Sequence, residues 1–308
     1  MKAVISFIIS FLFASTLAAG ATQKPVSPSE RAFNKANAEY YRERYPEALN
    51  LYIEAMDLAA KEGNDQVYIA STGYIGNVYD TFGDNNSCRF YYMKGYEAAR
   101  RVGDASMQAS FLTNIVTCLA RMGDVAGAKR YYRVFRELPD SVKDTENRYY
   151  DIYVRARILS AEHRYDDAMR EHRRALGFAR SHGMAPLFSL FQLSEIGNLY
   201  VRSGRAREAV AMGDSCAAMA RAIGSGEMLV NAYKMLADAY TQLQRTADAR
   251  RYREMYFDLN DSVYNIRKFY KARYKLSEYE NREHEQTVSQ LNERISHQVY
   301  AFLPLRRF

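Results

Sequence analysis

The sequence predicts an all-α solenoid of six stacked helical hairpins followed by one long helix. A small residue recurs every 40 or 41 residues, at Ala48, Cys88, Ala128, Ala168, Ala209 and Ala249. Glycines form two further series on this spacing, at Gly83, Gly123 and Gly204 and at Gly63, Gly103, Gly183 and Gly224. A fixed period of roughly 20 to 50 residues is typical of stacked repeats, in which each unit packs on its neighbours.

The first 28 residues have the composition of a leader and a linker. Met1 to Ala21 contains Lys2, an apolar run and a small-residue end, Ala19-Gly20-Ala21. This pattern predicts a secretory signal peptide and export, the alternative being an uncleaved leader that anchors the chain to a membrane. Residues 22–28 follow as a linker with two prolines.

The glycines divide the array into six repeats, because a helix often ends in one left-handed residue, which glycine adopts without strain. Apolar residues recur three and four positions apart between them, as amphipathic helices require. Glu43 and His163 replace the turn glycine in the first and fourth repeats. The predicted repeats span about 29–64, 65–104, 105–143, 144–184, 185–225 and 226–260.

Residues 74–84 and 195–205 resemble the first helix of a tetratricopeptide repeat (TPR). In that family a small residue allows the paired helices to approach, an aromatic residue follows three positions later, and a small residue opens the second helix. The first set is Ala36, Gly76, Val116, Ala156, Gly197 and Ala237, and the aromatic or apolar set includes Tyr79, Leu119, Leu159, Tyr200 and Tyr240. The resemblance implies a right-handed solenoid with a concave groove, whose dimensions differ from the family's because its usual period is about 34 residues.

Residues 261–300 are expected to form one long polar helix, capped by Asp261 and Ser262, with a short tail at 301–308. Val288, Leu291, Ile295 and Val299 keep the spacing of a seam that takes a partner helix, which suggests self-association through 288–299. The apolar stretch 301–305 is far shorter than the roughly 20 residues of a membrane span, so the mature chain is expected to have none.

The layout of leader, array and charged helix resembles that of exported bacterial TPR proteins, many of which continue into a transmembrane helix and an output module. Two interpretations follow. The chain is a stand-alone scaffold, or it is the sensory part of a signal-transduction or transcription regulator, truncated before its transmembrane and output modules.

The resemblance also implies groove residues, because the first helix of each TPR hairpin lines the concave surface. Ordinary solvated polar positions are the alternative interpretation. Phe33 stands where the family's carboxylate clamp has Lys, so recognition of an acidic carboxyl terminus is not expected. The groove candidates are Asn37, Asn77, Asp80, Thr113, Thr117, Tyr153, Arg157, Asn198, Arg202, Lys234 and Asp238.

The sequence lacks the motifs that are typical of other functional classes. The net charge of +7 comes from basic residues scattered beside acidic ones, so the array is not expected to bind nucleic acid. His163, His172 and His182 do not share a helical face, which predicts surface residues rather than metal ligands. Three cysteines exclude a full disulfide framework but leave open a bridge between Cys88 and Cys118.

The sequence also contains no nucleophile elbow, phosphate loop or HExxH motif, so no enzyme activity, metal or cofactor is expected. The prediction is therefore a non-enzymatic scaffold in the bacterial periplasm that binds a protein or peptide of unknown identity in its concave groove. The truncated regulator remains the alternative.

Overall fold

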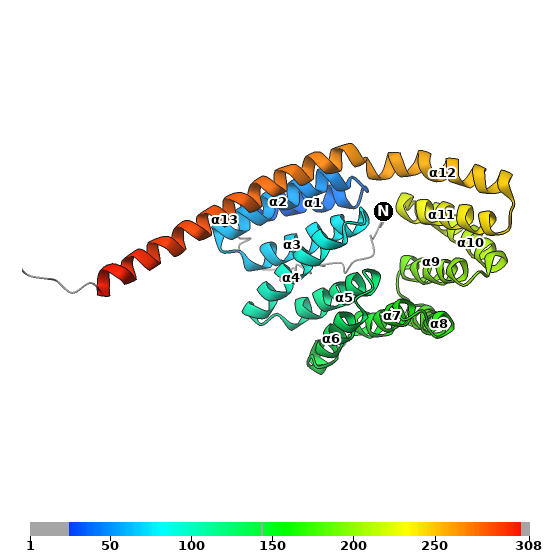
Figure 1. The fold of residues 1–308 in the computed structure, drawn as a ribbon, viewed down its shortest axis with the longest axis horizontal. Coiled ribbons are helices and arrows are strands. Elements are labelled where there is room, and N and C mark those ends of the chain that lie inside the picture. Colours follow the sequence, from blue (N-terminus) through cyan, green and yellow to red (C-terminus); the bar gives the residue numbers. More distant parts are fainter. Residues whose placement is uncertain (1–24, 143, 303–308) are drawn as a thin grey trace, which may run out of the picture. The chain divides into compact units, whose positions relative to one another are not determined.

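The computed structural model describes residues 25–142 and 144–302, and the predicted leader lies outside this range. Within it the chain forms six helical hairpins, no strand, and one final longer helix (Figure 1). The predicted all-α solenoid is confirmed. The first helices of the hairpins are α1 (Pro28–Tyr40), α3 (Asp65–Thr81), α5 (Ala105–Arg121), α7 (Thr145–Ala161), α9 (Pro186–Arg202) and α11 (Gly226–Gln242). The second helices are α2 (Tyr45–Glu62), α4 (Asn85–Val102), α6 (Val125–Arg136), α8 (Tyr165–Ser181), α10 (Ala206–Ile223) and α12 (Thr246–Tyr264).

Aspartates recur immediately before the middle helices and cap them. The side chain of Asp84 accepts a hydrogen bond from the Ser87 amide (3.1 Å), and Asp104 and Asp124 accept from Met107 and Gly127 in the same way. An N-cap of this kind satisfies one of the backbone N–H groups that the first helical turn leaves without a partner. The glycines that precede these aspartates, Gly83 and Gly103 among them, have positive φ, a conformation that glycine adopts without strain. This requirement explains why glycine recurs at the same position of the repeat.

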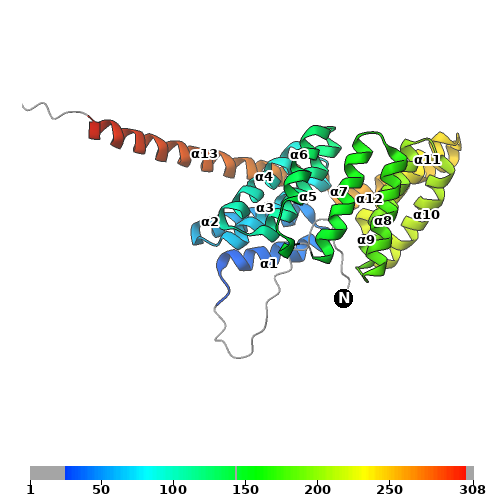
Figure 2. The same ribbon diagram turned by 90° about the horizontal axis from the view of Figure 1, so that it is seen from below.

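Small residues bring the paired helices into close contact. A β-carbon on Gly76 would lie 2.5 Å from the ring of Tyr92 on α4, so only glycine fits there. Ala36 and Ala156 are fully buried at the equivalent position of their hairpins. Figure 2 shows the hairpins following one another from α1 to α11. Each hairpin buries apolar side chains against the next.

The sixth hairpin returns to the first. The hydroxyl of Tyr45, at the start of α2, donates to Glu227 at the start of α11 (2.7 Å). The ring of Tyr264, at the end of α12, stacks on Tyr45 and meets Phe82 edge to face. The array of α1 to α12 therefore closes on itself, which the spacing of the repeats did not predict.

The third hairpin departs from the others because α6 has only 12 residues, against 17 to 19 in the other second helices. Pro139 follows its end, and a short 3-10 turn, η1 (Asp140–Val142), leads on to α7. Proline lacks the backbone N–H that a continuing helix needs. As a result α6 contacts α7 much less than α2, α4, α8 and α10 contact the first helix of the next hairpin.

The final helix, α13 (Ile266–Phe302), forms a separate unit. The expected cap at Asp261 and Ser262 is wrong, because both residues belong to α12 and the helix breaks at Asn265, whose φ is positive. Val288 and Leu291 are exposed, whereas the side chains of Ile295 and Val299 lie outside the part that the structure describes, so self-association stays a prediction. No helix within residues 25–302 is long and apolar enough to cross a membrane.

Candidate functional site

A polar cavity of about 230 Å³ opens on the inner face of the closed array. The first helices α3, α5, α7, α9 and α11 supply most of its wall, and Tyr92 of α4 and Tyr264 of α12 complete it. The other lining residues are Asp80, Thr81, Thr113, Asn114, Thr117, Arg121, Tyr150, Tyr153, Arg157, Phe191, Glu195, Glu227, Met228 and Asn231.

Two ion pairs tie neighbouring hairpins together across this wall. Arg121 of α5 pairs with Asp80 of α3, and its Nε also donates to the side chain of Asn85 (2.6 Å). Arg157 of α7 pairs with Glu195 of α9, and only 17% of either side chain is exposed. These four groups stand in pairs of opposite charge on rigid helices, which fixes the direction of each donor and acceptor.

Burial and pairing act in opposite directions on the Arg157–Glu195 pair. Burial opposes the charge on both groups, yet the guanidinium of Arg157 holds the pKa of Glu195 below its ordinary value. The carboxylate in turn raises the pKa of Arg157 despite its burial. Both groups are therefore ionised in the folded chain over the physiological pH range.

Hydrogen-bonding groups of other kinds line the cavity between the ion pairs. Asn114 and Asn231 present half-buried amide side chains, and Glu227 adds a third carboxylate. Tyr150, Tyr153 and Phe191 supply aromatic surface. Amides and paired charges can match the polar main chain of an extended peptide, while the aromatic rings provide apolar contact area.

The predicted groove residues fall into two groups. Asp80, Thr117 and Arg157 line the cavity, together with Thr113 and Tyr153. The other candidates lie outside it. Asn37 accepts a hydrogen bond from Tyr52 (2.7 Å), and the buried Asn77 accepts one from Tyr92 (3.2 Å).

The remaining candidates lie towards the surface. Arg202 donates to the hydroxyl of Ser160 (2.8 Å), Lys234 pairs with Asp238 at 3.1 Å, and Asn198 is exposed. Their part in binding stays a prediction.

The cavity contains residues that the sequence-based argument missed. Asn114 and Glu195 occupy the same position of the repeat, two residues before the small contact residues Val116 and Gly197. The position gave only a partial signal, because Tyr74, Val154 and Met235 occupy it in other hairpins and do not line the cavity. Glu227 and Tyr264 gave no such signal, because the closure of the array brings them to the site.

The expectation that all three histidines are surface residues is wrong for His172. Its side chain is fully buried, and Nδ1 forms a hydrogen bond with Oε1 of Gln192 (2.7 Å). The amide of Gln192 continues this network by donating to the hydroxyl of Tyr149. His163 and His182 are exposed. No group of three His, Cys, Asp or Glu side chains in residues 25–302 could hold a metal ion.

Comparisons with known proteins place the fold among TPR-like helical arrays. No protein-family model and no curated protein matches the chain. A Rap protein in complex with competence and sporulation factor is similar at a TM-score of 0.58 and 11% identity, over 76% of this chain and 75% of that one. The apo form of RapI gives a TM-score of 0.56 at 12% identity, over 81% and 87% of the two chains.

A third solved structure contains a TPR array as part of a larger protein. It is a signal transduction ATPase with numerous domains and a tetratricopeptide repeat sensor, from Pyrococcus horikoshii, at a TM-score of 0.54 and 16% identity. The match covers 80% of this chain but only 37% of that protein. At these identities the likeness concerns the fold, and the chain is a TPR-like helical solenoid.

Proposed function

We propose that this chain is a non-enzymatic scaffold that binds a peptide, or an extended segment of another protein, in the polar cavity of its closed array. The observation that carries the proposal is the wall of paired charges, amides and aromatic rings contributed by five successive first helices. Because rigid helices hold these groups, binding need not order them and so loses less free energy to entropy. The solved Rap structure, which holds a bound factor, supports the same use of this fold.

The side-chain amides of Asn114 and Asn231 provide the test. Changing a charged lining residue instead would leave its ion-pair partner unpaired. Peptides selected on the wild-type chain from a displayed library of random sequences should bind the Asn114→Ala/Asn231→Ala variant at least about tenfold more weakly, the equivalent of about 1.4 kcal/mol. Fluorescence anisotropy with labelled peptides measures this change.

Asn198→Ala is the matched control, because it removes an exposed amide from a first helix outside the cavity. Its affinity for the selected peptides should equal that of the wild type. If Asn198→Ala weakens binding and the double variant does not, the groove residues inferred from the family resemblance are the site, and the cavity is not.

We further propose that the scaffold works in the bacterial periplasm, a location that rests on the leader pattern of Met1 to Ala21. Expressed with this segment in a Gram-negative host, the chain should be recovered from the periplasmic fraction with an amino terminus near Thr22. Intact mass measurement decides the point. A full-length chain in the cytoplasm would contradict it.

A further inference from the structure

Two free thiols meet between α4 and α5, outside the lining of the polar cavity. The sulfur atoms of Cys88 and Cys118 lie 3.1 Å apart, and both side chains are buried. Both thiols also lie within hydrogen-bonding distance of one acceptor, the backbone carbonyl oxygen of Asn85 (3.4 and 3.3 Å). The two sulfur atoms therefore converge on one point of the fold, where a single bound atom could join them.

The packing of the two helices holds the thiols in this arrangement. Cys88 stands at the start of α4, at a repeat position that packs against neighbouring helices, and Cys118 stands near the end of α5. Because both helices are rigid, a ligand that bonds to both sulfur atoms need not bring them together first. In the other five hairpins the position of Cys88 is occupied by alanine, at Ala48, Ala128, Ala168, Ala209 and Ala249.

The surroundings of the pair favour the thiolate form of Cys118. The hydrogen bond from the Cys88 thiol lowers the pKa of Cys118, and the guanidinium of Arg121 acts in the same direction. The same hydrogen bond raises the pKa of Cys88. Since the thiolate is the nucleophile and the metal ligand, we expect Cys118 to react first and Cys88 to close the second bond.

The separation of the sulfur atoms selects the kind of atom that fits between them. With bonds of about 2.3 Å, two sulfur ligands lie about 4.6 Å apart on a linear ion, about 3.8 Å apart on tetrahedral zinc, and about 3.3 Å apart on an atom whose bonds meet near a right angle. The observed 3.1 Å is nearest to the last value. Zinc also lacks its further ligands, because no group of three His, Cys, Asp or Glu side chains within residues 25–302 could hold a metal ion.

Trivalent arsenic has this geometry, since its three bonds form a pyramid with angles near a right angle and it binds sulfur in preference to oxygen. We propose that Cys88 and Cys118, in their reduced form, chelate trivalent arsenic. With arsenous acid, two arsenic–oxygen bonds break and two arsenic–sulfur bonds form. Each thiol proton leaves with a hydroxyl group as water, the third hydroxyl stays on arsenic, and no oxidant or reductant takes part.

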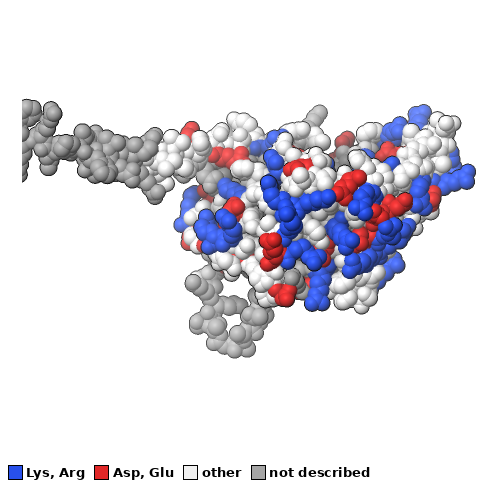
Figure 3. Space-filling model, turned by 60° about the horizontal axis from the view of Figure 1, so that its bottom comes forward, with Lys and Arg blue, Asp and Glu red and all other residues white. Residues whose placement is uncertain are grey.

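The thiols lie close to solvent on one side. The thioether sulfur of Met122 lies 3.9 Å from the sulfur of Cys118, and the Met122 side chain is exposed. Arsenous acid is uncharged at neutral pH, so its approach does not depend on the charge of the surface. Figure 3 shows one face of the molecule on which basic side chains are interrupted by acidic ones.

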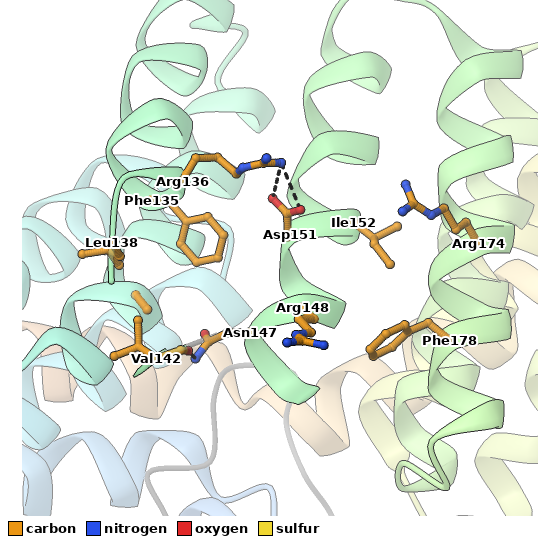
Figure 4. Close-up of a pocket in the computed structure, with 11 residues that line it drawn as sticks. Phe135, Arg136, Leu138, Val142, Asn147, Arg148, Asp151, Ile152, Arg174 and Phe178 are labelled. Carbon is orange, nitrogen blue, oxygen red and sulfur yellow. Dashed lines mark hydrogen bonds and ion pairs between the residues drawn. The ribbon is translucent and has the colours of Figure 1, made fainter. Parts of the chain in front are cut away.

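The largest cavity offers no competing site for arsenic. This cavity, of about 490 Å³, lies at the junction of the third and fourth hairpins, and no cysteine is among its lining residues (Figure 4). Its Arg136 pairs with Asp151 at 3.3 Å, and Phe135 and Phe178 supply apolar surface. Such a lining lacks the thiolates that arsenic requires.

Phenylarsine oxide is the probe for the test, because its single trivalent arsenic bonds to two thiols with release of one water. The intact mass of the desalted, reduced chain should show one bound phenylarsenic group. The Cys88→Ala variant should fold, since alanine is the residue of the other hairpins at this position. Its affinity, measured by competition with ethanedithiol, should be at least about a hundredfold weaker, because the remaining thiol forms only one bond.

Cys216→Ala is the matched control, because it removes a buried thiol that has no second thiol beside it in the described part of the chain. Its affinity for phenylarsine oxide should equal that of the wild type. Urea provides a second control, since it leaves the thiols intact but separates Cys88 and Cys118 by 30 residues of flexible chain. The unfolded chain should release the probe to ethanedithiol at a concentration at least about tenfold lower than the folded chain.

Several results would overturn the proposal. They are an unchanged affinity in Cys88→Ala, a loss of affinity in Cys216→Ala, and equal retention of the probe by the folded and unfolded chains. Binding of the probe to a chain in which Cys88 and Cys118 form a disulfide would place the arsenic elsewhere. A reduced chain that takes up zinc ions and not phenylarsine oxide would show that the pair serves a tetrahedral ion instead.

Discussion

His172 makes the stability of the fold depend on pH. Burial lowers the pKa of its imidazole below the ordinary value of 6.5, so the folded chain holds it neutral. As the pH falls below about 6.5 the unfolded chain takes up a proton first, and the free energy of unfolding should decrease until the folded pKa is reached. Urea unfolding at about pH 8, 6 and 5 should show the wild type losing stability relative to His172→Gln.

The exposed His163 provides the control for this prediction. The His163→Gln variant should follow the pH dependence of the wild type. If His172→Gln and His163→Gln change with pH in the same way as the wild type, the buried imidazole does not contribute to the dependence.

The thiols of Cys88 and Cys118 should form a disulfide under oxidising conditions. Their sulfur atoms lie 3.1 Å apart on α4 and α5, and both side chains are buried. Incubation with oxidised glutathione should convert the two thiols into a disulfide, with two glutathione thiols as the other product. By the chain-entropy argument for a loop of this size, the bridge should stabilise the fold by on the order of 3 kcal/mol, measured by urea unfolding with and without reductant.

Thiol titration provides the check. Cys216 is also buried, which raises the pKa of its thiol to about 12, and it should stay reduced. The oxidised chain should therefore retain one titratable thiol after unfolding. Three titratable thiols after oxidation would contradict the prediction.

At the residue scale, some of the groove residues expected from the sequence line the polar cavity, and their part in binding stays a prediction. Thr117 and Arg157 share the repeat position that faces the groove, because a periodic sequence places equivalent residues on the same face, and Asp80 lies one helical turn after that position in its own hairpin. Asn77 has the same repeat position as Thr117, yet it is buried against Tyr92. The repeat period alone does not show which of two equivalent residues is buried, because burial depends on the size of the neighbouring side chain.

At the scale of helices, Glu43 links the first hairpin to α11. Its carboxylate accepts hydrogen bonds from the Gly226 and Glu227 amides (3.1 and 3.3 Å) and from the hydroxyl of Ser225 (3.2 Å). An acidic group at a helix N-terminus compensates the unpaired N–H groups there. A β-carbon on Gly226 would lie 2.5 Å from this carboxylate, so glycine is needed for the contact.

Gln244 is the reference for measuring how much Glu43 contributes to the stability of the fold, because both residues have positive φ at the turn of a hairpin. Gln244→Gly should stabilise the fold by about 1 kcal/mol through relief of left-handed strain. Glu43→Gly gains the same relief but loses the three hydrogen bonds, and losing a cap costs about 1 kcal/mol. Thermal or urea unfolding should therefore show a gain for Gln244→Gly and little or none for Glu43→Gly, whereas equal gains would mean that Glu43 does not stabilise α11.

The helices were more predictable than their distant contacts. Turn glycines are local signals, so they predicted the hairpins well. Asn265, where α12 ends, was missed because a single left-handed asparagine in a polar stretch resembles any other helical residue. The contact of Glu43 with α11 joins residues about 180 positions apart, and a repeat pattern only reports which hairpins are neighbours.

At the scale of the whole array, closure couples the two ends of the α1 to α12 unit to the polar cavity. Tyr264 contacts Tyr45 of the first hairpin and Phe82 in the turn of the second, and it also lines the cavity. Tyr264→Ala should therefore release α11 from α2. Amide hydrogen exchange should become faster both at the start of α11 and at the turn between α1 and α2, because local opening exposes both segments.

Tyr252→Ala is the matched variant, since Tyr252 stacks on Tyr240 within the sixth hairpin. It should speed exchange in α11 and α12 and leave the turn between α1 and α2 unchanged. Peptide affinity should fall with Tyr264→Ala more than with Tyr252→Ala, because opening the array moves Glu227 and Asn231 away from Asp80 across the cavity. If Tyr264→Ala changes exchange in the sixth hairpin alone, the ends of the array are not coupled, and the cavity depends on neighbouring hairpins only.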